Sequence, residues 1–99
     1  MDLEADFYAF KEAHRPFLVK ARMEEFLNML STLSLNDEKE KFVSGRSAYG
    51  GTFNPFTIRH EVEMREEVLD FANYVDMKWF VEHKQDSNSF QEYVSQYMQ

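Results

Sequence analysis

Apolar residues recur at three- and four-residue steps along most of the chain, which is the spacing of one face of a helix. The clearest stripe lies in residues 17–33 and contains Val19, Met23, Phe26, Leu27, Leu30 and Leu33. A second stripe contains Met64, Val68, Ala72, Val75 and Trp79, and is widened by Ile58, Val62, Leu69 and Phe71. We expect both stripes to face a common core.

Polar and breaker residues between the stripes predict where helices begin and end. Asp2 can cap a first helix over residues 3–14. Pro16 would clash with the preceding turn of a continuous helix, so we expect a break at His14–Arg15 and a second helix that opens at Pro16.

A short third helix is predicted over residues 36–45, with Asp37 as its cap, Glu40 completing a capping box and Gly45 as its end. Residues 46–53 would then form a loop. Asn54–Pro55 is a strong helix start, and this helix could continue to about residue 84, with bends or breaks at Asp70, Asn73 or Asp76. A last helix is predicted over residues 89–98.

These elements predict an all-α fold, a compact bundle of four to five helices in one domain over residues 1–99. Residues 57–64 leave an alternative open, because Ile58, Val62 and Met64 also alternate as in a strand. The second interpretation is an α+β fold with one small hairpin around residues 47–64.

Composition supports a folded chain, since 43% of the 99 residues are hydrophobic and 16% are aromatic. The absence of cysteine excludes disulfides and thiolate metal sites. No apolar run approaches the length of a membrane span, and the first residues are acidic rather than leader-like. We expect a cytoplasmic protein without a membrane partner.

The net charge of −7 disfavours direct binding to nucleic acid and favours a partner protein with a basic surface, including proteins that handle nucleic acids. The charge is uneven, because residues 54–99 hold nine acidic and four basic residues. Five carboxylates fall within ten residues: Glu61, Glu63, Glu66, Glu67 and Asp70. We predict that they contact the partner; the alternative is a solvated face with Arg59–Glu63 and Glu61–Arg65 pairs.

The segment "GGTFNPFTIRH", residues 50–60, resembles the signature of the nicotinate-mononucleotide adenylyltransferase family, which reads roughly GGTFNPPHxGH. The resemblance implies that the glycines approach nucleotide phosphates and that His60 contacts the transferred phosphate. Thr57 and Arg59 depart from the signature. The family motif follows a buried strand of an α/β domain, and neither that strand nor enough chain after His60 is present here. We therefore do not expect this family's activity.

Two other roles remain open for this segment. It can be a tight turn into a helix, because Gly50 and Gly51 permit positive φ angles. It can also be an anion or nucleotide site, in which the loop amides and basic side chains surround a phosphate. The residues of that second hypothesis are Arg46, Gly50, Gly51, Thr52, Arg59 and His60.

No spacing of nucleophiles, bases or metal ligands predicts catalysis, since the three histidines are scattered and no serine sits in a nucleophile elbow. We expect no enzymatic activity, no cofactor and no metal. The leading hypothesis is a small acidic binding protein that occupies a partner's surface as an inhibitor or adaptor does; by analogy, phages and mobile elements encode such chains. The alternatives are a nucleotide- or anion-binding protein and an oligomeric structural component.

Overall fold

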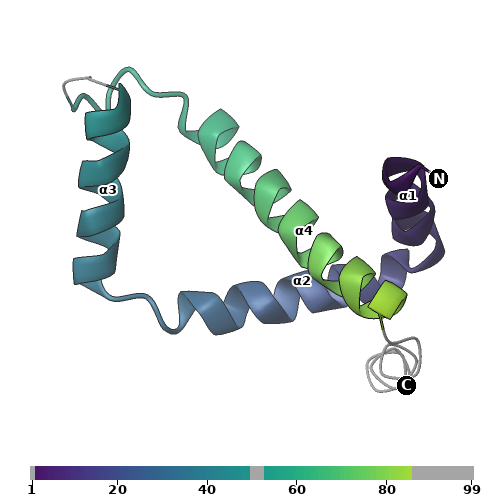
Figure 1. Cartoon of the computed structure of the whole chain (residues 1–99). Helices are drawn as coiled ribbons and strands as arrows, with labels where there is room; N and C mark the ends of the chain where they lie inside the picture. The colour runs from purple at the N-terminus through teal and green to yellow at the C-terminus, as the bar shows by residue number, and fades with distance from the viewer. Residues whose placement is uncertain (1, 50–52, 86–99) are drawn as a thin grey trace.

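A computed structural model describes residues 2–49 and 53–85, and within these ranges the chain is all-α (Figure 1). The helices are α1 (Leu3–Ala13), α2 (Arg15–Leu30), α3 (Leu35–Tyr49) and α4 (His60–Gln85). The predicted fold class is confirmed. The alternative hairpin is wrong, because residues 47–49 belong to α3, residues 60–64 belong to α4, and no strand occurs in the described ranges. The predicted last helix lies outside these ranges.

The first two helices begin as the sequence predicts. Asp2 Oδ1 accepts hydrogen bonds from the backbone N–H groups of Glu4 at 3.0 Å and Ala5 at 3.3 Å. The chain breaks at His14, whose φ of −120° and ψ of 26° are not helical, and Pro16 lies in the first turn of α2. Proline suits that position because the first N–H groups of a helix have no partner within it.

Later helix boundaries differ from the prediction. Ser34 caps α3, since its Oγ accepts the N–H of Asp37 and donates to the Asp37 carboxylate. Gly45 does not end this helix, which continues to Tyr49, and a glycine within a helix costs only about 1 kcal/mol. Residues 46–49 are therefore helical rather than part of the predicted loop.

The Asn54–Pro55 segment forms a turn rather than the start of α4. Asn54 Oδ1 accepts the N–H of Phe56 at 3.1 Å, and the Asn54 carbonyl accepts the N–H of Thr57 at 3.4 Å. The asparagine side chain thus stabilises a turn of its own, which is the usual alternative to capping. The helix begins at His60 and then continues without a break through Asp70, Asn73 and Asp76.

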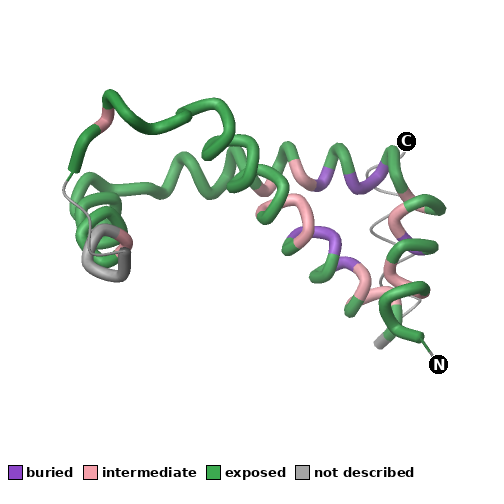
Figure 2. Tube along the Cα trace, turned by 90° about the horizontal axis from the view of Figure 1, so that it is seen from above, coloured by how far each residue is buried: buried purple, intermediate pink, exposed green. Residues whose placement is uncertain are grey.

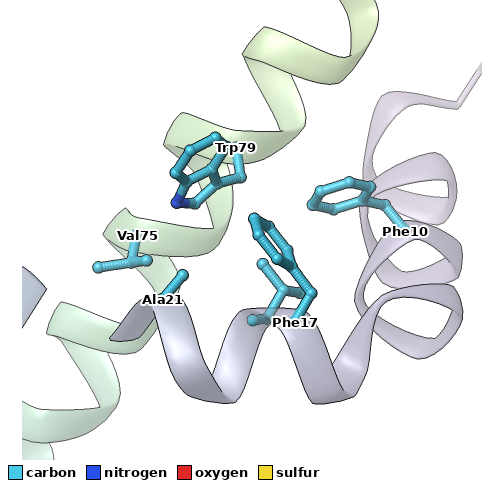
Figure 3. Packing of buried hydrophobic residues seen from close by; sticks show 6 residues of the cluster. Phe10, Phe17, Ala21, Val75 and Trp79 are labelled. Atoms are coloured by element: carbon cyan, nitrogen blue, oxygen red, sulfur yellow. The ribbon is translucent and has the colours of Figure 1, made fainter. Parts of the chain in front are cut away.

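Buried side chains gather at one end of the molecule, where α4 crosses the first half of α2 and α1 packs beside them (Figures 1 and 2). The buried apolar residues of the described ranges are Phe10, Phe17, Leu18, Ala21, Val75 and Trp79. Figure 3 shows Phe10, Phe17 and Trp79 pointing toward one another from the three helices, with Val75 beside Ala21. The rings of Phe17 and Trp79 meet edge to face at 5.1 Å between centroids.

Asp76 is the polar centre of this packed end, and its side chain is fully buried. Arg22 donates from Nε to Oδ1 at 3.0 Å and from Nη2 to Oδ2 at 2.5 Å, while Lys11 Nζ lies 3.0 Å from Oδ2. Lys11 also donates to Asn73 Oδ1 at 2.6 Å. One carboxylate therefore joins α1, α2 and α4, and the two cations offset the cost of its burial.

The predicted core stripe of α2 is wrong, because its residues are exposed and, apart from Phe26, face away from α1 and α4. Their exposed fractions range from 39% at Val19 to 63% at Leu27. The packed face instead carries Phe17, Leu18 and Ala21, together with Arg22 and Glu25, which bond to side chains of α4. A count of apolar spacing treats these two polar residues as solvent-facing, and so selects the opposite face of the helix.

Candidate functional site

The second half of α2, α3 and the first half of α4 form an open end with little burial (Figure 2). No Cα atom of α3 approaches another described helix closely. Large apolar side chains of this end are exposed by 40% or more on each element, for example Phe26, Phe42, Phe56 and Val68. Exposed apolar surface of this extent marks interaction sites in soluble proteins.

An apolar groove of about 580 Å³ lies between α2 and α4 at this end. Its residues are Phe26, Met64, Glu67, Val68, Asp70, Phe71 and Tyr74. The Phe26 and Phe71 rings meet edge to face at 5.3 Å between centroids, which fixes the point where α2 and α4 begin to separate. Met64 and Val68 are more than half exposed, so the apolar floor of the groove is open to a partner.

Four of the predicted partner-binding residues share one side of α4. Helical steps of three and four residues align Glu63, Glu66, Glu67 and Asp70, and we call this set the acidic face. Glu67 and Asp70 also line the apolar groove, so the acidic face forms one of its walls. Glu61 lies on a different side of the helix, and the structure does not join it to the other four.

All five predicted carboxylates are exposed. The ion pairs between described residues are Lys11–Asp76, Arg22–Asp76, Lys78–Glu25 and Lys84–Asp6, and none includes the acidic face. The Arg59–Glu63 and Glu61–Arg65 pairs expected for a solvated face are likewise absent from these four. Within the described ranges, no cation therefore lies at ion-pair distance from the acidic face.

The residues of the predicted anion site are only partly within the described ranges. Gly50, Gly51 and Thr52 lie outside them, and Arg46 belongs to the last turns of α3. Arg59 and His60 lie where α4 begins, with the His60 ring Nε2 2.9 Å from the carbonyl oxygen of Pro55. Glu61 and Glu63 occupy the first turn of α4 and repel an anion from that helix end. No described contact favours a phosphate there.

A pair of histidines lies at the opposite end of the molecule. The rings of His14 and His83 are 5.7 Å apart, and Phe10 stacks on His83 at 5.4 Å. Burial lowers the pKa of His14, and the charge of His83 lowers it further. This cluster belongs to the packed end, because Phe10 is part of the buried core.

The described ranges hold no group of three histidine, aspartate or glutamate side chains placed to bind a metal ion. None of the described helices combines the length and the apolar character that crossing a membrane requires.

The residues that sequence reasoning missed are those of the groove, because Phe26, Met64 and Val68 were expected inside a core. Tyr74 was not singled out at all, although it is 71% exposed and lines the groove. Comparison with protein-family models, with characterised proteins and with solved structures gave no match.

Proposed function

We propose that this protein is a non-enzymatic binding protein that takes up a basic, amphipathic segment of a partner protein in the groove between α2 and α4. The groove supports this proposal, because its apolar floor lies beside the carboxylates of Glu67 and Asp70. A helix with one apolar and one basic side matches both surfaces at once.

The apolar floor of the groove and the acidic face would contribute to binding in different ways. Apolar contacts with Met64, Val68 and Phe26 would bury exposed side chains and hold the complex together. The acidic face, at the rim, would attract a basic partner and orient it during approach. The net charge of −7 extends this attraction beyond contact distance at low ionic strength.

A partner of this chemistry fits the class of proteins that expose basic surfaces to nucleic acids. Occupying such a surface would block it, as an inhibitor does, or recruit it, as an adaptor does. We find no described contact that favours the nucleotide-binding alternative over this one.

The test is a binding titration with two labelled synthetic helices of equal length, one of leucine and lysine and the other of leucine and glutamate. We expect only the basic helix to bind, and its affinity to fall as salt is added. Failure of the basic helix to bind would contradict the proposal.

The Glu63→Gln/Glu66→Gln/Glu67→Gln variant should associate with the basic helix about 3- to 10-fold more slowly and with a flatter salt dependence. The matched control is Glu4→Gln/Glu12→Gln/Glu38→Gln, which removes the same charge from exposed positions outside the groove. Equal slowing in both variants would show that net charge, rather than the acidic face, steers association.

A further inference from the structure

The exposed side of α2 has the residue spacing of a helix that pairs with a second helix. Val19, Met23, Phe26 and Leu30 follow one another at steps of four, three and four, and Leu27 lies beside them. This is the seam spacing of coiled coils. We call these five residues the α2 seam, and all are at least 39% exposed. The helices α1 and α4 pack on the other side of α2, except that the ring of Phe26, at the edge of the seam, also meets Phe71 of α4.

We propose that the α2 seam binds the α2 seam of a second copy of this chain, forming a homodimer with the two α2 helices antiparallel. The proposal goes beyond partner binding in the groove and does not depend on it. A seam that places apolar side chains at alternating three- and four-residue steps is complementary to a copy of itself, and paired copies form a closed twofold contact.

Charge favours this side of the molecule for self-contact. The α4 helix carries seven acidic and three basic residues, so two copies repel along it. The α2 helix carries three basic and two acidic residues, and none of them interrupts the seam. Among the surfaces of an acidic chain, α2 is therefore one that a second copy can approach without strong repulsion.

The antiparallel direction follows from where the packed end lies. Phe17, Leu18 and Ala21 anchor α1 and α4 on the first half of α2, whereas the second half extends away from them (Figure 1). In a parallel pair the two packed ends would lie side by side, and Lys20 would lie near its counterpart in the other copy. In an antiparallel pair the two packed ends lie at opposite ends of the contact between the α2 helices.

The area of the seam sets the expected strength. Its five side chains are 39–63% exposed, so they expose on the order of 400 Å² per copy if a large side chain presents about 150–200 Å² when fully free. Two copies then bury on the order of 800 Å² of apolar surface, which is below the roughly 1,200 Å² of stable interfaces. The dimer should therefore be reversible and dependent on concentration.

The experiment is a measurement of molar mass by sedimentation equilibrium over a concentration series. We expect the wild type to pass from monomer to dimer, and the Met23→Glu/Leu30→Glu variant to remain monomeric throughout. Both residues are 46% or more exposed, so the variant should keep its helical circular dichroism and its low-concentration Tm. The control, Leu69→Glu/Val81→Glu, alters two comparably exposed residues of α4 and should dimerise as the wild type does.

Three results would overturn the proposal: a wild type that stays monomeric, a seam variant that dimerises normally, or a control that loses the dimer equally. The first is the result expected if residues 86–99 or another protein cover the seam.

The direction of the two α2 helices is tested separately by disulfide cross-linking, since this chain has no cysteine of its own. Under oxidation, Val19→Cys mixed with Leu30→Cys should form a mixed disulfide dimer, whereas Val19→Cys alone should not link to itself. Self-linking of Val19→Cys would show a parallel pair.

Discussion

The two ends of this molecule use the same kinds of residues for different purposes. At the packed end, Phe17 is 1% exposed and Trp79 is 6% exposed, and buried ion pairs join three helices. At the open end, Phe56 is 93% exposed and Leu35 is 82% exposed. The packed end supplies the stability of the fold, and the open end offers apolar surface that the described chain does not use.

Substitution of Asp76 gives the strongest test of the difference in stability between the two ends, because Asp76 stabilises only the packed end. Asp76→Asn would leave Arg22 and Lys11 half-buried without their carboxylate, and we expect the free energy of unfolding to fall by about 3–5 kcal/mol. Urea denaturation measures this loss. The same chemical change at the open end, Glu66→Gln, should alter stability by less than about 0.5 kcal/mol. Similar losses in both variants would refute the contrast between the two ends.

Two leucines of α2 test the difference between the packed and the open end within a single helix. Leu18 is 1% exposed and Leu30 is 46% exposed. Leu18→Ala should cost about 2–5 kcal/mol, as buried truncations do. Leu30→Ala should cost less than about 1 kcal/mol when measured at low protein concentration, where no dimer forms. The opposite order would mean that the predicted stripe does face the core.

The smallest expected effect concerns pH. The folded-state pKa of His14 lies below the ordinary value of about 6.5, chiefly because of burial and then because of His83. Its neutral form is favoured in the fold, so this contribution to stability is present above about pH 6.5 and is lost as pH falls through that value toward the lowered pKa. His14 and His83 line a small cavity together with Asp6 and Lys84, which add their charges to the local field.

The Tm should therefore fall less steeply between about pH 7 and pH 5 in His14→Gln than in the wild type, as thermal unfolding would measure. His60→Gln, at an exposed position where α4 begins, serves as the control. An unchanged slope in His14→Gln would show that His14 does not contribute to the pH dependence.

Local signals in the sequence predicted local structure well. Asp2 and Pro16 act within one helical turn, and the structure follows both. The spacing in α4 also predicted the buried Val75 and Trp79, although Met64, Val68 and Leu69 of the same predicted stripe are exposed. The predictions at Asp2 and Pro16 succeed because capping and proline geometry depend on neighbours along the chain.

The choice of the packed face of α2 could not be predicted in the same way. That face depends on Arg22 meeting Asp76, which lies 54 residues further along the chain. The groove was missed for the same reason, because Phe26, Met64 and Val68 have the spacing of core residues and only their three-dimensional placement shows that they are exposed. The acidic face was visible in the sequence as a charge cluster, and the helical spacing of residues 61–70 places Glu61 on a different side of the helix from the other four.

The crossing of α2 and α4 has a further consequence for chain entropy. The contact between Phe26 and Phe71 brings two distant parts of the chain together. The stretch of about 45 residues between them, which includes α3, is therefore a loop whose two ends are held in place. The entropic cost of closure grows only with the logarithm of loop length, by about 0.6 kcal/mol for each doubling. Residues can thus be added to or removed from α3 and its connections at little cost to the packed end, which leaves α3 free to vary in length.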